Sequence, residues 1–350
     1  MSFIRPNFRH PETPKNAIGF TRKDYEGSIS TLCAGCGHDS ISAAIINACF
    51  DMAIEPHKVA KLSGIGCSSK TPTYFLGNSH GFNSVHGRMP SVTTGANLAN
   101  RDLTYIGVSG DGDSASIGLG QFSHAVRRNL NMLYIVENNG CYGLTKGQMS
   151  ATTDYESVNK AGMKNFYEPI DLVGLALQLG ATFVARSFSG DKQQLEPLIK
   201  AAISHRGFAF IDVVSPCVTF NNNPGSKKSY EFVREHCEAT GTIDFVPMEQ
   251  EITTDYPAGT TEDITLHDGS VIRLNKAAND MDVHNRQAAL NAVQNATQKG
   301  EVLTGLLYVD TDPCDLHDII KTSDKPLNAL KEASLCPGNQ TLQTINDSFR

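Results

Sequence analysis

Short apolar runs alternate with stretches of helical spacing along the first two thirds of the chain. The runs are too short for helices, and they predict buried strands over 59–63, 103–108, 132–136, 182–186 and 208–214. Helical spacing of apolar residues predicts helices over 39–46, 114–126, 171–180 and 192–204. Strands that alternate with helices are typical of parallel sheets. The pattern therefore predicts an α/β fold, with an open, mostly parallel sheet and helices on both faces.

The chain divides into three parts by composition. Residues 1–30 are polar and carry three prolines, which predicts an extended arm outside the core. Residues 31–225 hold the alternating pattern. Residues 226–350 are more polar, and 266–272 predict a β-hairpin on an Asp-Gly turn. We expect this C-terminal extension to pack on the core or on a partner subunit, as an interaction or lid-like element or as plain scaffold.

The composition narrows the function. The 350 residues carry 40% hydrophobic side chains and a net charge of −7, which suits a globular enzyme and disfavours a nucleic-acid-binding protein. We find neither a signal core at the N-terminus nor an apolar stretch of membrane length, and we expect a cytoplasmic protein that does not bind membranes. Nine cysteines in such a protein indicate metal or redox chemistry rather than disulfides.

The most informative stretch is Gly110-Asp111-Gly112-Asp113, which follows one predicted strand, with Asn139 at the end of the next. The carboxyl ends of parallel strands meet at one edge of a sheet, where α/β proteins bind ligands. Carboxylate and amide oxygens are hard ligands that suit magnesium, which usually also binds phosphate oxygens. The sequence therefore predicts a magnesium-diphosphate site.

Polar residues and a glycine mark the predicted helix ends. Asp39 or Ser40 is expected to cap the first helix. Asp113 or Ser114 is expected to cap the helix after the glycine-aspartate motif, so that its N-terminus points at the diphosphate. Gly180 is expected to end the helix that precedes it.

Four cysteines near element ends predict a metal or cluster site. Cys33 and Cys36 form a Cys-x-x-Cys pair, which can bind one edge of a metal or cluster. Cys67 and Cys217 each follow a predicted strand, so that four soft ligands become available. A redox dithiol or two buried thiols are the alternatives for the pair.

Basic residues near these motifs are candidates for binding anions. Lys70 follows the turn of the third cysteine, and His86 and Arg88 precede a stretch of small residues. Their side chains can donate to phosphate or carboxylate oxygens. A solvated lysine and a structural histidine are the plain alternatives. The polar, glycine-rich loop 141–148 cannot continue the strand before it and is expected to lie over the site, where the carbonyl of Cys141 matters more than its sulfur.

Five motifs, in this order, resemble those of one family. They are Cys33-Ala34-Gly35-Cys36-Gly37-His38, Gly66-Cys67-Ser68-Ser69-Lys70, His86-Gly87-Arg88, Gly110-Asp111-Gly112-Asp113, and Asn138-Asn139 followed by Leu144-Thr145-Lys146-Gly147-Gln148. Over about residues 30–225 the chain resembles the β subunit of 2-oxoacid:ferredoxin oxidoreductases, which has a thiamine-diphosphate-binding fold. The cysteines separate this family from thiamine-dependent decarboxylases and transketolases, which carry no cluster.

The resemblance implies ligands for three cofactors and a substrate. Magnesium is expected to bind Asp111, Asn139 and the backbone carbonyl of Cys141. One [4Fe–4S] cluster is expected to bind Cys33, Cys36, Cys67 and Cys217. The expected contacts of thiamine diphosphate, besides the magnesium ligands Asp111 and Asn139, are Gly37, His38, Gly66, Ser68, His86, Gly110, Gly112, Asp113, Tyr142, Gly143, Leu144 and Thr145. The 2-oxoacid is expected to contact Lys70, Lys146 and Arg88.

The resemblance also implies a reaction and its partners. The family oxidatively decarboxylates a 2-oxoacid, transfers the acyl group to coenzyme A, and passes single electrons through the cluster to ferredoxin. The glutamate that activates thiamine is expected on an α subunit, as a γ–α fusion in an αβ or (αβ)2 complex, so the chain alone should be inactive. Two candidate lysines and the long C-terminal extension favour 2-oxoglutarate, converted to succinyl-CoA, over pyruvate and other 2-oxoacids. The reaction is expected to be reversible.

Two other functions are compatible with these residues. A non-oxidative thiamine-diphosphate decarboxylase or synthase treats the cysteines as incidental and contains no iron or sulfide. An electron-transfer or metal-sensing module treats Asp111 and Asn139 as structural and contains no thiamine diphosphate.

Overall fold

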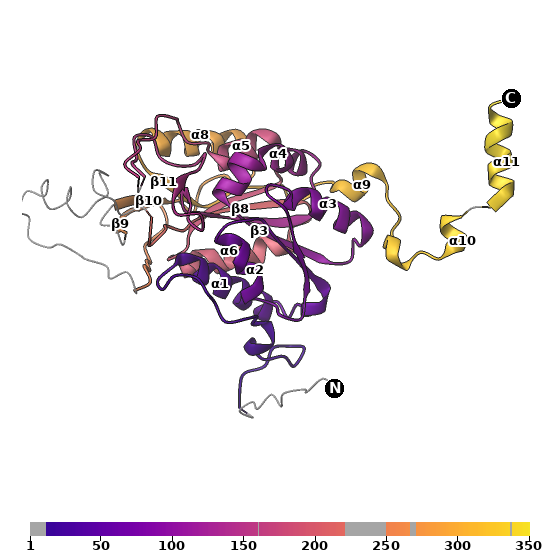
Figure 1. Cartoon of the computed structure of the whole chain (residues 1–350), viewed down its shortest axis with the longest axis horizontal. Coiled ribbons are helices and arrows are strands. Elements are labelled where there is room, and N and C mark those ends of the chain that lie inside the picture. Colours follow the sequence, from indigo (N-terminus) through magenta and orange to yellow (C-terminus); the bar gives the residue numbers. More distant parts are fainter. Residues whose placement is uncertain (1–11, 160, 221–249, 267–270, 337) are drawn as a thin grey trace, which may run out of the picture.

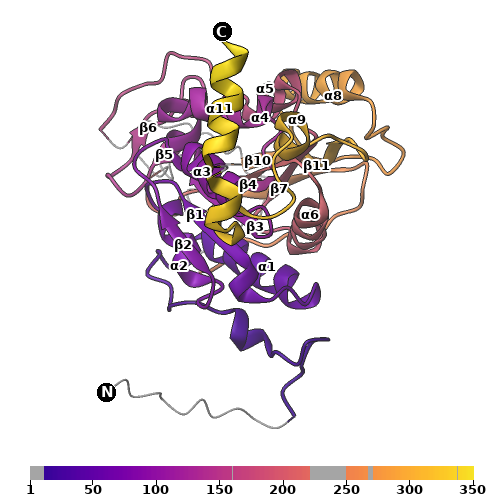
Figure 2. The ribbon, with the colours of Figure 1, turned by 90° about the vertical axis from the view of Figure 1, so that its right-hand side faces the viewer.

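A nine-stranded sheet lies between two layers of helices in the computed structural model, which describes residues 12–159, 161–220, 250–266, 271–336 and 338–350 (Figures 1 and 2). In chain order, the strands are β1 (Val59–Ser63), β2 (His80–Asn83), β3 (Thr104–Gly110), β4 (Met132–Asn138), β7 (Phe183–Phe188), β8 (Phe208–Val214), β9 (Thr261–Thr265), β10 (Val271–Lys276) and β11 (Val302–Val309). Across the sheet their order is β2-β1-β3-β4-β8-β7-β11-β10-β9.

Most neighbouring strands are parallel. From β2 to β7 along the sheet every pair is parallel, and so is the pair of β10 with β11. Only β11 against β7 and β9 against β10 are antiparallel among the described strands of this sheet. The predicted open, mostly parallel sheet with helices on both faces is therefore confirmed.

The helices form two layers with separate apolar clusters. One layer consists of α3 (Met89–Ala99), α4 (Leu119–Arg127), α5 (Leu172–Leu179) and α8 (Arg286–Gln298). The opposite layer consists of α1 (Gly37–Asp51), α6 (Lys192–Ser204) and the short α2 (Thr71–Tyr74). In the first cluster the ring of Phe122 meets Tyr134, Phe208 and Phe210 edge to face. Because both faces are covered, the central strands are buried throughout and read as continuous apolar runs.

The C-terminal extension continues the same sheet. β9 and β10 form the predicted hairpin pair, whose Asp-Gly turn lies outside the described residues, and β11 pairs with β7. Beyond α9 (Leu316–Ile320), the chain leaves the sheet and ends in α10 (Glu332–Leu335) and α11 (Gly338–Ser348), neither of which has a buried residue (Figure 1). The predicted boundary at residue 225 also falls outside the described residues and stays a prediction.

Two predictions need correction, one about the start of the first helix and one about the N-terminal arm. α1 begins at Gly37 with Cys36 as its N-cap, so Asp39 and Ser40 lie inside the helix, where Asp39 still favours the positive end of the helix dipole. The arm is not wholly outside the core, because Tyr25 is fully buried and its ring meets Phe50 edge to face. An aromatic side chain surrounded by polar residues gives a weak pattern in sequence.

Among the residues that the structure describes, we find no helix with both the length and the apolar character needed to cross a membrane.

The predicted end of α5 at Gly180 is confirmed and can be tested. Gly180 has φ +90° and its N–H donates to the carbonyls of the last turn. Gly180→Ala is expected to lower the free energy of unfolding by about 1–2 kcal/mol, because an L side chain is strained in this conformation. Gly120→Ala in α4, where an added Cβ meets no atom within 4 Å, is the matched control and should not destabilise. Chemical denaturation followed by circular dichroism measures both, and equal effects would contradict the assignment.

Candidate active site at the carboxyl edge of the sheet

Asp111 and Asn139 meet where β3 and β4 end side by side. The two strands pair in parallel register up to Gly110 and Glu137, so the residues that follow them are neighbours. The backbone N–H of Asn139 donates to Asp111 Oδ1 at 3.3 Å. The juxtaposition expected from parallel strands is therefore present in the structure.

The Asp111 carboxylate is almost fully buried and is held by hydroxyl groups. Its Oδ2 accepts from Ser150 Oγ and from Thr152 Oγ1, the latter at 2.7 Å. Burial raises the pKa of Asp111, while these two hydroxyls and the Asn139 N–H oppose the rise because they stabilise the charged form. Ser150 and Thr152 were not anticipated from the sequence. The hydroxyl-rich segment 150–153 directly after the predicted site loop is the signal that could have identified them.

Asp113 serves a different purpose from the cap that the sequence suggested. Its Oδ1 accepts from the backbone N–H of Gly87 at 2.6 Å and its Oδ2 accepts from Ser109 Oγ at 2.8 Å. The helix after Asp111 starts as a π-helical turn, η4 (Gly112–Ile117), which contains both Asp113 and Ser114. The predicted cap is therefore wrong, because Asp113 ties the turn before α3 to the motif instead.

The loop after Asn139 is a small hairpin that packs on the glycine-aspartate motif. β5 (Cys141–Tyr142) pairs antiparallel with β6 (Gln148–Met149). The hydroxyl of Tyr142 donates to the carbonyl of Gly112 at 2.9 Å, and a Cβ on Gly112 would lie 2.4 Å from the Tyr142 ring. Glycine is required at position 112 because the ring occupies the space of any side chain. The expectation that loop 141–148 lies over the site is thereby confirmed.

The four predicted cluster cysteines come from three turns, because Cys33 and Cys36 share one. Cys67 Sγ and Cys217 Sγ lie 3.4 Å and 3.6 Å from the position that a Cβ on Gly143 would take. The hydroxyl of Thr219 lies 3.6 Å from Cys33 Sγ. Negative charge on Cys217 contributes to raising the pKa of both Cys36 and Cys67, which indicates that these two thiols lie near Cys217.

The donor set of these cysteines, four soft thiols, fits a [4Fe–4S] cluster. A [4Fe–4S] cluster takes one thiolate for each iron, so its ligands surround a larger body. The bare glycine at position 143 leaves space beside Cys67 and Cys217. Burial raises the pKa of Cys67 to about 11 and also raises that of Cys36, so iron binding must displace protons.

The sulfur of Cys141 makes a contact that was not predicted. The Cys141 thiol hydrogen-bonds to Cys217, and this bond lowers the pKa of Cys217 against the effect of burial. The same hydrogen bond and burial raise the pKa of Cys141. The expectation that only the carbonyl of Cys141 matters is therefore incomplete, because its side chain reaches a predicted cluster ligand.

The other residues that were predicted to contact thiamine diphosphate or the 2-oxoacid differ in exposure. His38, Ser68, Asp113 and Gly143 are buried, whereas His86, Arg88, Leu144, Thr145 and Lys146 are exposed. Lys70 closes η3 (Ser68–Lys70) and is partly exposed. Lys146 has φ +80°, a conformation that costs energy for a residue with a side chain and is often retained at functional sites.

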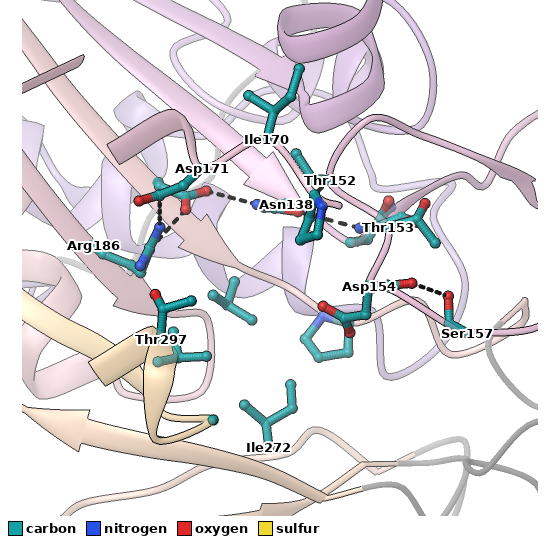
Figure 3. Close-up of a pocket in the computed structure, with 18 of the residues that line it drawn as sticks. Asn138, Thr152, Thr153, Asp154, Ser157, Ile170, Asp171, Arg186, Ile272 and Thr297 are labelled. Carbon is teal, nitrogen blue, oxygen red and sulfur yellow. Dashed lines mark hydrogen bonds and ion pairs between the residues drawn. The ribbon is translucent and has the colours of Figure 1, made fainter. Parts of the chain in front are cut away.

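A cavity of about 440 Å³ opens beside Asn138 (Figure 3). Arg186 in its wall forms ion pairs with Asp171 at 2.6 Å and Asp212 at 2.9 Å. Asp212 also accepts from Asn138 Nδ2 at 3.1 Å. The cavity was not predicted, because its walls combine the core with the hairpin β9–β10 and α8, which are distant in sequence.

Comparisons with known proteins agree with this geometry. Residues 64–213 match the model of the thiamine pyrophosphate enzyme C-terminal TPP-binding domain. The fold and the site thus define an α/β protein of the thiamine-diphosphate-binding class.

Relatives narrow the class to a family. A 2-oxoacid:ferredoxin oxidoreductase β subunit from Saccharolobus solfataricus is 43% identical over 191 residues, which are 54% of this chain and 63% of the relative. The 2-oxoglutarate synthase subunit KorB of Methanocaldococcus jannaschii is 38% identical over 205 residues, 58% of this chain and 74% of the relative. The chain belongs to the family of 2-oxoacid:ferredoxin oxidoreductase β subunits.

A solved structure extends the similarity to nearly the whole chain. A chain of the 2-oxoglutarate:ferredoxin oxidoreductase from Magnetococcus marinus, with 2-oxoglutarate, coenzyme A and succinyl-CoA bound, matches with a TM-score of 0.68 and 31% identity. The match covers 89% of this chain and 90% of that one. By sequence, the chain spans about 60% of the length of the archaeal 2-oxoacid:ferredoxin oxidoreductase β subunits that it matches.

The hydrogen bond between Cys141 and Cys217 can be tested in the chain prepared without iron. Cys141→Ala is expected to slow alkylation of Cys217 at pH 7 by about 10-fold, because loss of this bond lets burial raise the pKa of the Cys217 thiol and the thiolate fraction falls. Peptide mass spectrometry after timed iodoacetamide treatment measures the rate. Cys314, which is exposed, provides an internal reference whose rate should stay the same. An unchanged rate at Cys217 would exclude the contact.

Proposed function

We propose that the chain is the β subunit of an enzyme that converts 2-oxoglutarate and coenzyme A to succinyl-CoA and CO2. The electrons leave singly through one [4Fe–4S] cluster to ferredoxin, and the reaction can run in reverse. The α subunit completes the active site. Pyruvate and other 2-oxoacids are the alternative substrates.

One observation carries this proposal. The hairpin 141–149 packs on the Asp111 motif through Tyr142 and on the sulfurs of Cys67 and Cys217 through Gly143. A diphosphate-binding turn and a set of soft ligands therefore share one small loop. A non-oxidative thiamine enzyme has no use for thiols at this position, whereas an enzyme that exports single electrons needs a cluster there.

The chain's own residues hold the cofactor rather than carry out its chemistry. Asp111, Asn139 and the carbonyl of Cys141 are the proposed magnesium ligands, a set of hard oxygens that suits this ion. Ser150 and Thr152 orient the Asp111 carboxylate through their hydroxyls. When bound, thiamine diphosphate supplies the carbon nucleophile and the electron sink for decarboxylation.

The substrate assignment rests on two lysines and on the relatives. 2-Oxoglutarate has two carboxylates, and Lys70 and Lys146 offer two separate cations near the site edge. Arg88 adds a third on the turn that Asp113 holds through Gly87. Relatives from Mycobacterium tuberculosis and Methanocaldococcus jannaschii are named for 2-oxoglutarate, which supports this substrate over pyruvate.

This chain offers a surface that suits docking of the proposed α subunit. The segment that follows the hairpin exposes large apolar side chains, with Met163, Phe166 and Tyr167 between 61% and 81% exposed and Tyr155 half exposed, and Leu144 in the hairpin itself is also about half exposed. Exposed apolar residues beside a half-formed site are typical of a subunit interface. We place the activating glutamate on this partner.

The proposal is tested with the chain co-produced with its α subunit and purified without oxygen. We expect iron and sulfide, thiamine diphosphate in an acid extract, and coenzyme A-dependent oxidation of 2-oxoglutarate coupled to ferredoxin reduction. Cys67→Ala should remove the cluster signal and ferredoxin reduction while thiamine diphosphate remains. Asp111→Ala should remove thiamine diphosphate, and with it ferredoxin reduction, while the cluster signal remains. The chain without its partner should show no turnover.

Cys314→Ala is the matched control, since Cys314 is exposed and lies far from the site in sequence. A wild-type complex without iron that still releases CO2 would point to a non-oxidative thiamine enzyme. A complex with a cluster but no thiamine diphosphate would point to an electron-transfer module.

The lysine assignment has its own test. Lys70→Met and Lys146→Met are each expected to raise the KM for 2-oxoglutarate about 10-fold or more, because each removes a charge-assisted contact to a carboxylate. Steady-state kinetics of the complex measure this. Lys200→Met is the control. It breaks ion pairs with Asp51 and Glu196 in the layer of α1 and α6, and it should leave the KM for 2-oxoglutarate unchanged. Unchanged KM in both site variants would refute the assignment.

A further inference from the structure

A chain of four buried polar side chains lies behind the predicted cluster ligands. His38 Nδ1 hydrogen-bonds to Ser215 Oγ at 2.7 Å, and its Nε2 lies 3.8 Å from Glu137 Oε2. Thr71 Oγ1 donates to the same Glu137 oxygen at 2.9 Å. Exposure does not exceed 1% for any of the four residues. The chain therefore runs from Ser215 through His38 and Glu137 to Thr71 inside the protein.

Three of these residues sit beside three of the predicted cysteine ligands in sequence. His38 follows Cys36 by two residues, Thr71 follows Cys67 by four, and Ser215 precedes Cys217 by two. The fourth, Glu137, ends the buried part of β4, just before the predicted magnesium turn. One polar chain thus connects three separate cysteine turns with the strand that carries the magnesium site.

His38 also reaches a cysteine through its backbone. Its N–H donates a hydrogen bond to the sulfur of Cys36. The ring of His38 is held by its hydrogen bond to Ser215, and its backbone N–H lies in the first turn of α1. Packing is tight on the same turn, where a Cβ on Gly37 would lie 2.3 Å from Ser189 Oγ and 2.7 Å from Ser215 Oγ.

The fold alone does not explain a polar chain at this depth. An isolated buried carboxyl is costly, and Glu137 Oε1 has no hydrogen-bond partner among the described residues. An apolar side chain would fill the same volume at lower cost. Buried polar residues next to a metal site commonly orient the metal ligands. This role would explain why polar side chains are present beside the predicted cluster ligands.

We propose that His38 and Glu137 are positioning residues for the cluster, which hold the Cys36, Cys67 and Cys217 turns at the separation that four irons require. His38 in addition aims its backbone N–H at Cys36 Sγ, and hydrogen bonds to cluster sulfurs raise the reduction potential because they stabilise the added electron. This inference rests on the proposed function, since it requires the cluster to be present.

The test uses Glu137→Leu and Ser215→Ala in the complex with the α subunit. Each variant should lose iron to a chelator about 10-fold faster than the wild type, as is typical when a residue behind a metal ligand is removed. The cluster that remains should have an altered electron paramagnetic resonance spectrum and a lower midpoint potential. Glu137→Gln keeps an acceptor for Thr71 and should restore wild-type iron retention within a factor of about two.

His205→Leu is the matched control for a general loss of packing. His205 also forms a hydrogen bond to a buried hydroxyl, that of Thr182 at 2.8 Å, but no predicted cluster cysteine lies beside it in sequence. Thermal unfolding and thiamine diphosphate content are measured in every variant. Unaltered spectra, potential and iron retention in both Glu137→Leu and Ser215→Ala would overturn the inference, and so would equal iron loss in His205→Leu. A wild-type complex without any cluster would instead overturn the proposed function.

Discussion

The structure of the site depends on a single constraint, which is that β3 and β4 are parallel neighbours and end together. Two polar residues that are far apart in sequence, Asp111 and Asn139, are thereby brought within hydrogen-bond distance. The Asp111 carboxylate is buried and must be hydrogen-bonded, and the hydroxyls of Ser150 and Thr152 meet this need. The loop that carries these hydroxyls has to fold back over the strand ends, and the hairpin 141–149 is the result.

The hairpin joins two kinds of chemistry over a short distance. On one side the Tyr142 ring packs on Gly112, and on the other the bare backbone of Gly143 faces the sulfurs of Cys67 and Cys217. Cys141 belongs to both, because its carbonyl is a proposed magnesium ligand and its thiol reaches Cys217. The hairpin thus lies between the hard oxygen donors of the Asp111 motif and the soft sulfur donors of the cysteines. This proximity is the physical reason for preferring an oxidoreductase to a decarboxylase.

The same edge of the sheet explains why a partner subunit is expected. A site at the ends of parallel strands is open on its outer side, and the segment nearby exposes Phe166 and Tyr167 instead of burying them. The described residues of the C-terminal extension do not close this side with a separate domain. It adds β9, β10 and β11 to the sheet and then leaves it (Figure 1).

The sequence by itself determined the alternation of strands and helices, the Asp111–Asn139 pair and the four cysteines, because each is carried by local spacing or by a short motif. It did not determine what the buried polar groups do. Asp113 looked like a helix cap but holds Gly87, and Glu137, which carries no motif signal in the sequence, faces His38 and Thr71. These partners are separated by up to about a hundred residues, so only the tertiary packing of several turns decides which donor meets which acceptor. The antiparallel addition of β11 to β7 was likewise decided by packing, since strand pairing at that distance leaves no local pattern.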